Sequence, residues 1–228
     1  MKILVVTSKP DRPEHHLLCG IASKGHTLLI CAEFPKTLLG IPAQATYHLP
    51  VKSRIDPAAI LRLRGIITKE KPDVIHSFSA RSLTTALLAS AGLKIAHVAY
   101  RGTTGHLSKF SPLSWLSFLH TRVHGISCVS NAVERYLEGL GIPKERLKTI
   151  YKGHNTSWYT QATPQTRKSL GIPDEAFVVG FVGNMRPVKG ADLLLESAFK
   201  LPTDGSIHLL LVGDLRDKSI KKMYDKHP

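Results

Sequence analysis

Short apolar runs alternate with helical patterns along the first two thirds of this chain. The apolar runs predict strands, which are Lys2–Thr7, Thr27–Ala32, 73–77, 95–100, 125–130 and 147–151. Helical periodicity between them predicts helices, which are 14–24, 56–71, 81–91 and Asn131–Gly139. Asp56 suits the N-cap of the second helix and Pro57 suits its first turn. This alternation is typical of βαβ units and predicts an α/β fold with a doubly wound, mostly parallel sheet.

The pattern stops and restarts once. Residues 153–174 are polar, contain Pro164 and Pro173, and predict a linker with one helix around 165–170. After them come a strand at 177–183, a helix at 189–200, a strand at 207–213 and a helix over 218–226. We therefore expect an N-terminal domain (1–160), a linker (161–175) and a second Rossmann-like unit (176–228). Two strands are fewer than a sheet normally has, so this unit is expected to be incomplete.

The loop after the strand at 177–183 carries a candidate anion site. Arg186 and Lys189 lie in it, and Gly190 opens the following helix. Free backbone N–H groups and the helix dipole attract anions at such a position, and phosphate is the usual anion. Gly190 lets the backbone approach a ligand closely. The alternative is an ordinary turn with solvated cations.

Net charge and its distribution favour an anionic partner. The formal net charge is +14, and no carboxylate occurs between Asp73 and Glu134. A phosphorylated acceptor, an anionic membrane surface or nucleic acid would suit this charge. Few aromatic residues are interleaved with the basic ones, which disfavours nucleic acid. The alternative is a generically basic surface.

One segment inside this basic interval is apolar and aromatic. Its large side chains are Phe110, Leu113, Trp115, Leu116, Phe118 and Leu119. They predict an interfacial helix that lies on a membrane, and core packing of the same helix is the alternative.

Other sequence features indicate the cellular location of the protein and exclude several kinds of site. No apolar run approaches the ~20 residues that a membrane-spanning helix needs, and the apolar start is too short for a signal peptide. Cys19, Cys31 and Cys128 are widely spaced in apolar segments, so we expect buried, reduced thiols in a cytosolic protein. No metal-ligand spacing, P-loop or Ser-His-Asp set occurs. A Gly-x-Gly-x-x-Gly motif is absent after the first strand, which argues against a dinucleotide dehydrogenase.

Candidate substrate contacts follow the predicted strands, because ligands bind beyond the carboxyl ends of parallel strands. They are Lys9, His15, Arg81, Arg101, Thr103, Thr104 and Asn155. Arg101 and His76 are also candidate catalytic residues. A structural loop is the alternative for 101–105, and a core histidine is the alternative for His76.

Four segments together resemble the family-four retaining glycosyltransferases, which have two Rossmann-like domains (the GT-B architecture). They are residues 1–7 with Ser23-Lys-Gly-His-Thr27, Lys71-Pro-Asp-Val-Ile-His-Ser77, Ile150-Tyr-Lys-Gly-His-Asn155, and Phe181-Val-Gly-Asn-Met-Arg-Pro-Val-Lys-Gly190 with Leu209-Leu-Leu-Val-Gly-Asp214. The last pair is the most specific.

The resemblance implies a cytoplasmic transferase that moves a sugar, with retention, from a nucleotide sugar to a glycan or lipid-linked glycan. Such an acceptor implies a role in cell-envelope glycan synthesis at the inner face of the membrane. Arg186 and Lys189 match the residues that bind the donor diphosphate in the family. No metal or other cofactor is then expected, because fixed cations stabilise the departing diphosphate.

Some positions depart from the family's pattern. Residues 9–13 hold no glycine, Phe78 stands where many members have a second histidine, and Asn155 stands in place of an aspartate. The family's two-glutamate motif would lie beyond Pro228, so we expect a truncated chain that is inactive alone. Two alternatives stay open: another GT-B enzyme such as a nucleotide-sugar epimerase, and a non-catalytic anion- or membrane-binding module.

Overall fold

The computed structural model describes residues 1–160 and 162–226 of the chain. Backbone contacts divide the chain into two compact units, Met1–Asn155 and Thr156–Pro228. The expected linker begins at residue 161, which lies outside the described residues.

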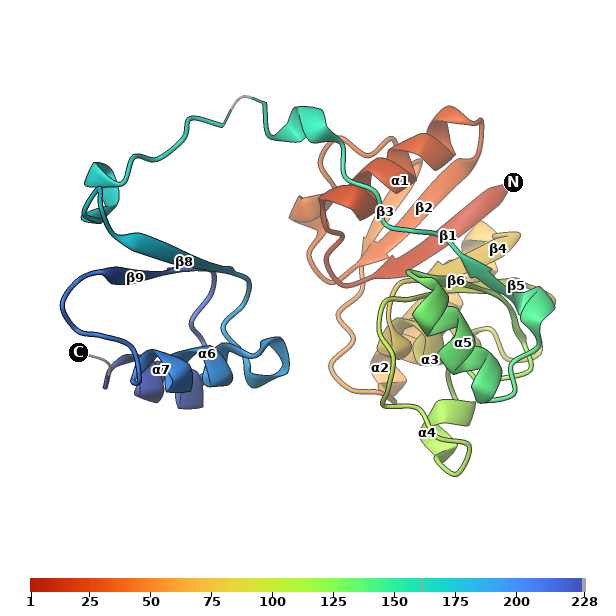
Figure 1. The fold of residues 1–228 in the computed structure, drawn as a ribbon. Helices are drawn as coiled ribbons and strands as arrows, with labels where there is room; N and C mark the ends of the chain where they lie inside the picture. Colours follow the sequence, from red (N-terminus) through yellow and green to blue (C-terminus); the bar gives the residue numbers. More distant parts are fainter. Residues whose placement is uncertain (161, 227–228) are drawn as a thin grey trace. The chain divides into compact units, whose positions relative to one another are not determined.

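The first unit is built on a seven-stranded parallel sheet with the order β3-β2-β1-β4-β5-β6-β7 (Figure 1). The strands are β1 (Lys2–Thr7), β2 (Thr27–Ala32), β3 (Ala45–His48), β4 (Val74–Ser77), β5 (Ala96–Arg101), β6 (Val123–Cys128) and β7 (Leu147–Thr149). The inner strands β1 and β2 are apolar and almost wholly buried, as expected for a sheet covered on both faces. The predicted α/β fold with a doubly wound sheet is confirmed.

Helices lie on both faces of this sheet (Figure 1). They are α1 (Arg12–Ser23), α2 (Pro57–Glu70), α3 (Ala80–Ala89), α4 (Pro112–Trp115) and α5 (Asn131–Gly139). Strands β2 and β3 are added on one side of β1, and strands β4 to β7 are added on its other side. Right-handed crossovers therefore place α1 on one face and α2, α3 and α5 on the other. Two core clusters reflect this, because Val5 packs with Leu18 of α1, whereas Leu4 packs with Leu63 of α2.

The helices begin at side-chain caps. Asp11 and Glu14 form a capping box at the start of α1, so this helix begins two residues before the predicted position. Asp56 caps α2 through the backbone N–H of Ala59, with Pro57 in the first turn, as predicted. Ser130 caps α5.

Several predicted elements were wrong in detail. The sequence did not indicate β3, because its residues alternate between half-buried and exposed positions and lack an apolar run. β6 lies two residues before the predicted strand, since Val123 fills the core while Val129 and Ser130 form the turn into α5. The predicted interfacial helix is only the four-residue α4. Phe118 and Leu119 are buried in the core at its carboxyl side.

A buried polar network ties α3 to β5 and β6. Arg122 donates to the carbonyl oxygens of Leu87 (2.9 Å) and Ser90 (2.8 Å) at the end of α3. The Ser90 hydroxyl is 2.9 Å from Nε2 of His97, which is fully buried. Arg122 thus satisfies carbonyl groups that a helix end leaves unpaired. One cation of the carboxylate-free interval therefore has a structural role.

Two of the three cysteines are buried as expected. Burial raises the pKa of the Cys31 thiol to about 12 and that of Cys128 to about 11. Cys19 is only partly buried, and its Sγ lies 3.7 Å from the carbonyl oxygen of Gly40. All three are free thiols.

The second unit has two parallel strands, β8 (Phe177–Val182) and β9 (Ile207–Val212), and two helices, α6 (Ala191–Ala198) and α7 (Lys218–Tyr224). Its small core consists of Met185, Ala191, Leu195 and Ile220. The helix predicted over 189–200 is shorter, because Pro187–Lys189 form a 3-10 turn and Gly190 adopts a left-handed conformation (φ 78°). The helix predicted around 165–170 is a 3-10 turn at Lys168–Leu170.

We predict that acid weakens the first unit through its buried histidines. Burial lowers the pKa of His76 and of His97 from 6.5 to about 4. Between these values the unfolded chain binds protons that the folded chain does not, so stability falls as the pH drops below 6.5. Each histidine should remove about 2 kcal/mol of unfolding free energy between pH 7 and pH 5.

Urea denaturation of wild type and His97→Gln at both pH values measures this effect. The glutamine keeps a donor toward Ser90 but does not titrate. Its loss of stability between pH 7 and pH 5 should be about 2 kcal/mol smaller than that of the wild type, because residue 97 no longer titrates. An equal loss in both proteins would contradict the assignment.

Candidate functional site

The carboxyl edge of the first sheet gathers the predicted substrate contacts. The sheet reverses its strand order between β1 and β4, and such a switch point is where open α/β sheets bind ligands. Lys9 follows β1, Thr103 and Thr104 follow β5, and Asn155 follows β7. All four side chains are exposed. Their placement at one edge leaves them accessible to a ligand.

Two other predicted contacts, His15 and Arg81, form hydrogen bonds that hold loops of the first unit. Nε2 of His15 is 2.8 Å from the carbonyl oxygen of Leu39. Arg81 donates to the carbonyl oxygen of Val51 at 3.1 Å. A ligand at this edge of the sheet would therefore have to share these side chains with the carbonyl groups that they already contact.

Arg101 organises the loop that follows it. Its Nε donates to the carbonyl oxygen of Thr103 at 2.8 Å, and its Nη2 donates to that of Gly105 at 2.5 Å. The guanidinium also lies over the ring of Phe118, 4.9 Å from the centroid. Arg101 is only 9% exposed and, after Arg122, is a second cation of the basic interval with a structural role. It presents the two exposed threonines rather than reaching into solvent itself.

His76 lies among aromatic rings at the end of β4. Its ring centroid is 4.4 Å from that of Phe78, which in turn is 6.0 Å from that of Tyr100. Burial keeps the imidazole neutral, and its Nε2 has no hydrogen-bond partner among the described residues. A neutral imidazole can accept or donate one hydrogen bond at this nitrogen, depending on its tautomer.

An ion cluster that sequence reasoning did not identify lies beside these rings. Lys152 pairs with Asp11 and, at 3.2 Å, with Glu14. Its ammonium group is 5.6 Å from the ring centroid of Tyr100. Burial raises the pKa of Glu14, and the nearby Asp11 charge adds to this effect. The cluster joins the start of α1 to the segment after β7, which only the folded chain brings together.

A small cleft of about 140 Å³ opens beside this cluster. Glu14, Phe78, Tyr100, Ser127 and Lys152 are among the residues that line it. Its wall combines aromatic rings with one ion pair, which suits a ligand with both apolar and hydroxyl groups.

In the second unit the carboxyl ends of β8 and β9 lie unusually close together. The N–H of Gly183 donates to the backbone carbonyl oxygen of Val212 at 2.9 Å. The N–H of Met185 donates to the backbone carbonyl oxygen of Asp214 at the same distance. A Cβ at Gly213 would overlap the carbonyl oxygen of Gly183 and lie 2.7 Å from its carbon. Only glycine fits at Gly213, and this contact shapes the loop that carries the predicted phosphate-binding residues.

Arg186 and Lys189 both lie exposed on this loop, before α6. Arg216 forms an ion pair with Asp214 at 2.7 Å. The pKa of Asp217 is lowered mainly by the Ser219 hydroxyl, and the Arg186 charge contributes. Lys189 forms no ion pair within the described part of the chain. The loop therefore offers accessible positive charge beside a helix N-terminus, where an anion is stabilised.

Asp192 is a further polar residue at this position that the sequence did not indicate. It lies in the first turn of α6, and its Oδ1 is buried without a hydrogen-bond partner among the described residues. A buried carboxylate oxygen without a donor is unfavourable. Its placement was not predictable, because a solvated acidic residue in a first helical turn has the same sequence pattern.

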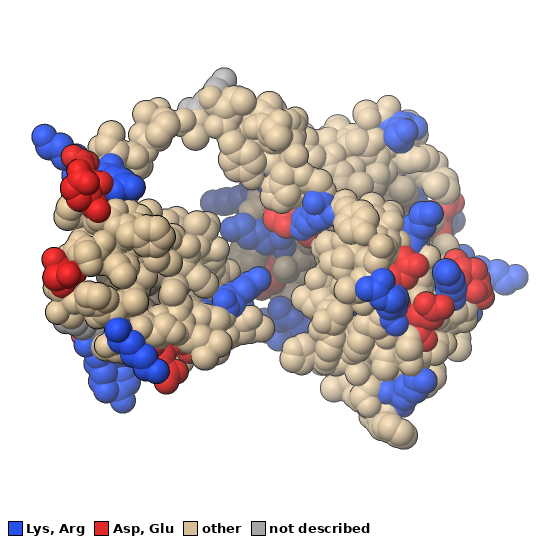
Figure 2. Space-filling view, viewed as in Figure 1, with Lys and Arg blue, Asp and Glu red and all other residues tan. Residues whose placement is uncertain are grey.

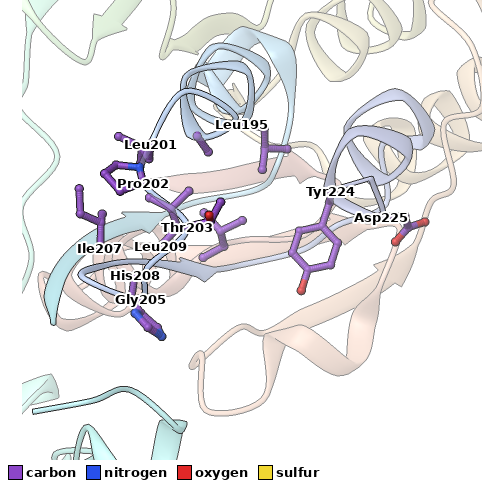
Figure 3. Close-up of a pocket in the computed structure, with 12 residues that line it drawn as sticks. Leu195, Leu201, Pro202, Thr203, Gly205, Ile207, His208, Leu209, Tyr224 and Asp225 are labelled. Atoms are coloured by element: carbon purple, nitrogen blue, oxygen red, sulfur yellow. The ribbon is translucent and has the colours of Figure 1, made fainter. Parts of the chain in front are cut away.

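A groove of the second unit lies away from this loop. It has a volume of about 570 Å³ and lies between α6, β9 and α7 (Figure 3). Leu195, Leu201, Ile207 and Leu209 line it, with Tyr224 at the end of α7. Its lining includes Asp225 but no lysine or arginine, so we do not assign the diphosphate to it.

Comparison with known families accounts for nearly the whole chain. Residues 15–158 match the model of Glycosyltransferase Family 4, and residues 162–228 match that of Glycosyl transferases group 1. The chain belongs to glycosyltransferase family 4. The predicted family resemblance is thereby confirmed.

Curated relatives of this family-4 chain match it over shorter segments. A D-inositol 3-phosphate glycosyltransferase from Corynebacterium urealyticum is 37% identical over 83 residues, which are 33% of this chain and 20% of the relative. One from Mycolicibacterium smegmatis is 28% identical over 71 residues, 31% of this chain and 16% of the relative.

Solved structures share the fold over almost all of this family-4 chain. Anabaena HepE in complex with UDP-glucose has a TM-score of 0.71 at 22% identity, over 99% of this chain and 65% of that one. A glycosyltransferase from Rickettsia africae has a TM-score of 0.69 at 19% identity, over 98% and 64%. UDP-GlcNAc 2-epimerase from Methanocaldococcus jannaschii has a TM-score of 0.61 at 13% identity, over 99% and 70%. The chain thus spans about 65% of the length of the first two neighbours, and the GT-B fold is confirmed.

Two further observations apply to the described residues of this family-4 chain. No group of three or more His, Cys, Asp or Glu side chains is placed to hold a metal ion. No helix is long and apolar enough to cross a membrane.

We predict that Gly213→Ala disrupts the loop of the second unit. The new Cβ would overlap the Gly183 carbonyl group, so the two strand ends must separate at a cost of about 1–3 kcal/mol or more. Hydrogen exchange should then speed up over 183–190. Gly180→Ala in β8 is the matched control, because its Cβ would meet no atom within 4 Å. Equal protection of the loop in both variants would refute the close contact.

Proposed function

We propose that the chain is the acceptor-side domain and the first part of the donor domain of a retaining glycosyltransferase. The donor is a nucleotide sugar, and its diphosphate binds the loop with Arg186 and Lys189. The observation that carries this proposal is the loop between β8 and α6, with its two exposed cations and its tight glycine contact. The complexes of HepE with UDP and with UDP-glucose support a uridine nucleotide as the first candidate.

The chemistry follows from the charge that develops on the leaving group. When the bond between sugar and diphosphate breaks, the nucleoside diphosphate gains negative charge. Arg186 and Lys189 would stabilise that charge more than they stabilise the bound substrate, which lowers the barrier. Under this proposal the reaction needs no metal or other cofactor.

The acceptor site is proposed at the carboxyl edge of the first sheet. Lys9, Thr103, Thr104 and Asn155 are exposed there and offer one cation with hydroxyl and amide groups. An anionic acceptor with several hydroxyl groups would suit these side chains, such as a glycan or lipid-linked glycan of the cell envelope. The named acceptor of the curated relatives, D-inositol 3-phosphate, has the same character.

His76 and Arg101 take different roles in this proposal. Arg101 positions the threonine loop through the carbonyl groups of Thr103 and Gly105. His76 remains the candidate for direct contact with the reacting sugar, because its buried Nε2 lacks a partner among the described residues. A neutral imidazole suits hydrogen bonding to a sugar hydroxyl group.

An epimerase is the second candidate, because UDP-GlcNAc 2-epimerases share the fold. Both family models that match the chain describe glycosyltransferases, which favours transfer. We place the protein in the cytoplasm, with peripheral contact to the inner face of the membrane. Incubating a full-length form of the enzyme with a UDP-sugar and separating the products distinguishes the two reactions, since an epimerase needs no acceptor.

We predict that Arg186→Ala/Lys189→Ala weakens UDP binding at least tenfold. Hydrogen bonds to charged groups contribute ~1.5–3 kcal/mol each, and this variant removes two charged donors. Isothermal titration calorimetry of wild type and variant with UDP measures the change. Equal affinities would refute the diphosphate site.

A matched control separates local contacts from net charge. Lys200→Ala/Lys222→Ala removes the same charge from two other exposed residues of the second unit. Its affinity for UDP should stay within about twofold of the wild type, because exposed charges beyond a Debye length are screened. If both double variants lose affinity equally, only the general positive field attracts UDP.

A further inference from the structure

The small cleft beside the ion cluster is lined by both aromatic rings and polar groups. Phe78 and Tyr100 supply the rings, whose centroids are 6.0 Å apart, and Glu14, Ser127 and Lys152 supply the polar groups. The cleft has a volume of about 140 Å³. Pockets that take drug-sized ligands have volumes of about 300–1,000 Å³, so this cleft has room for a single ring and not for a whole nucleotide.

The polar groups of the cleft keep hydrogen-bonding capacity for a ligand. A lysine ammonium group has three N–H donors, and Lys152 uses two of them on Asp11 and Glu14. Glu14 also accepts from the backbone N–H of Asp11 at 3.3 Å, which leaves acceptor positions on its carboxylate. The Ser127 hydroxyl forms no hydrogen bond within the described part of the chain. A ligand can therefore find both donors and acceptors here.

These groups suit a ring that bears several hydroxyl groups. A hydroxyl group both donates and accepts, so neighbouring hydroxyls of one ring can donate to Glu14 and accept from Lys152 at the same time. The C–H groups of such a ring are weakly positive and are attracted to the negative faces of aromatic rings, here Phe78 and Tyr100. One cyclic polyol can thus use the whole lining of the cleft.

The charges of the ion cluster disfavour a phosphate group in the cleft. Asp11 and Glu14 bring two carboxylates to the single ammonium group of Lys152. Figure 2 shows red and blue groups side by side near the start of α1. A phosphate would meet an excess of negative charge, which repels it, whereas an uncharged ring would not.

The cleft adjoins the candidate acceptor residues at the carboxyl edge of the first sheet. A Cβ on Gly102 would lie 3.0 Å from the hydroxyl oxygen of Tyr100, so the Tyr100 ring lies against the start of the loop with Thr103. Lys9 lies two residues before Asp11 of the ion cluster. A ligand that fills the cleft is therefore close to both segments.

We propose that the cleft holds one uncharged, hydroxyl-bearing six-membered ring of the acceptor, a sugar or a cyclitol. This inference rests on the proposed function, in which the acceptor binds at this edge of the sheet. Glu14, Ser127 and Lys152 orient the ring through its hydroxyl groups, and Tyr100 favours a ring over an open chain. The charged or lipid-linked part of the acceptor stays outside the cleft, toward the exposed Lys9.

Saturation-transfer NMR on the whole chain tests this proposal with glucose and myo-inositol as uncharged probes. At least one of them should receive saturation, and the stronger signal distinguishes a sugar from a cyclitol. Mannitol, an open-chain polyol, should bind more weakly than the ring probe. Ser127→Ala should raise the dissociation constant roughly threefold to tenfold, because its hydroxyl bonds only to the ligand. Tyr100→Leu should raise it about fivefold through loss of the aromatic face.

Two variants are matched controls. Ser23→Ala removes an exposed hydroxyl from the last turn of α1, and Tyr224→Leu removes a ring from the groove of the second unit. Both should bind the probes like the wild type. Ser127→Ala leaves no buried partner unpaired, so its thermal unfolding should match that of the wild type and its effect on binding is local.

Three results would overturn the proposal. These are absence of saturation transfer to both ring probes, wild-type affinity in both Ser127→Ala and Tyr100→Leu, or a loss in Tyr224→Leu as large as that in Tyr100→Leu. Calorimetric titration of Ser127→Ala with UDP should give the wild-type affinity. Failed ring binding with intact UDP binding would contradict the acceptor cleft alone, whereas failed UDP binding in the wild type would contradict the donor site.

Discussion

The parallel pairing of β1 with β4 is the constraint on which the arrangement of the first unit depends. From this pair the chain winds outward in both directions, so right-handed crossovers separate α1 from α2, α3 and α5. The strand ends on both sides of the pair then face the same edge. Loops from β1, β4, β5 and β7 meet there without any sequence proximity. The ion cluster of Lys152 with Asp11 and Glu14 is one result, since it joins residues about 140 positions apart.

The second unit obtains its candidate site from a different constraint. Gly213 lacks a side chain, so the end of β9 can approach the carbonyl group of Gly183. That contact and the bond from Met185 to Asp214 fix the path of the loop into α6. Gly190 in a left-handed conformation then completes the turn before the helix. The backbone geometry of this loop therefore determines where Arg186 and Lys189 lie. Packing of their own side chains is not required to hold the loop.

The positive charge of the chain serves more than one purpose. Arg101 and Arg122 lie in the basic interval but bond to backbone carbonyl groups, where they hold a loop and a helix end. Lys152 is neutralised by two carboxylates. The charge that remains for partners is therefore smaller than the formal value and is concentrated on particular loops, such as those with Lys9, Lys109 and Lys189.

The sequence by itself determined most of the strands and helices, the α/β fold, the family and the position of the cationic loop. Apolar runs, helix caps and glycines are local signals, and Asp56 or Gly190 acts mainly on its neighbours. The tertiary structure alone decided the partners of Arg101, His15 and Arg81, the pairing of Lys152, and the edge strand β3. It also decided that Phe118 is buried while Phe110 is exposed. These outcomes depend on packing between residues far apart in sequence, and the same side chain can be a ligand contact, a loop support or part of the core depending on what folds against it.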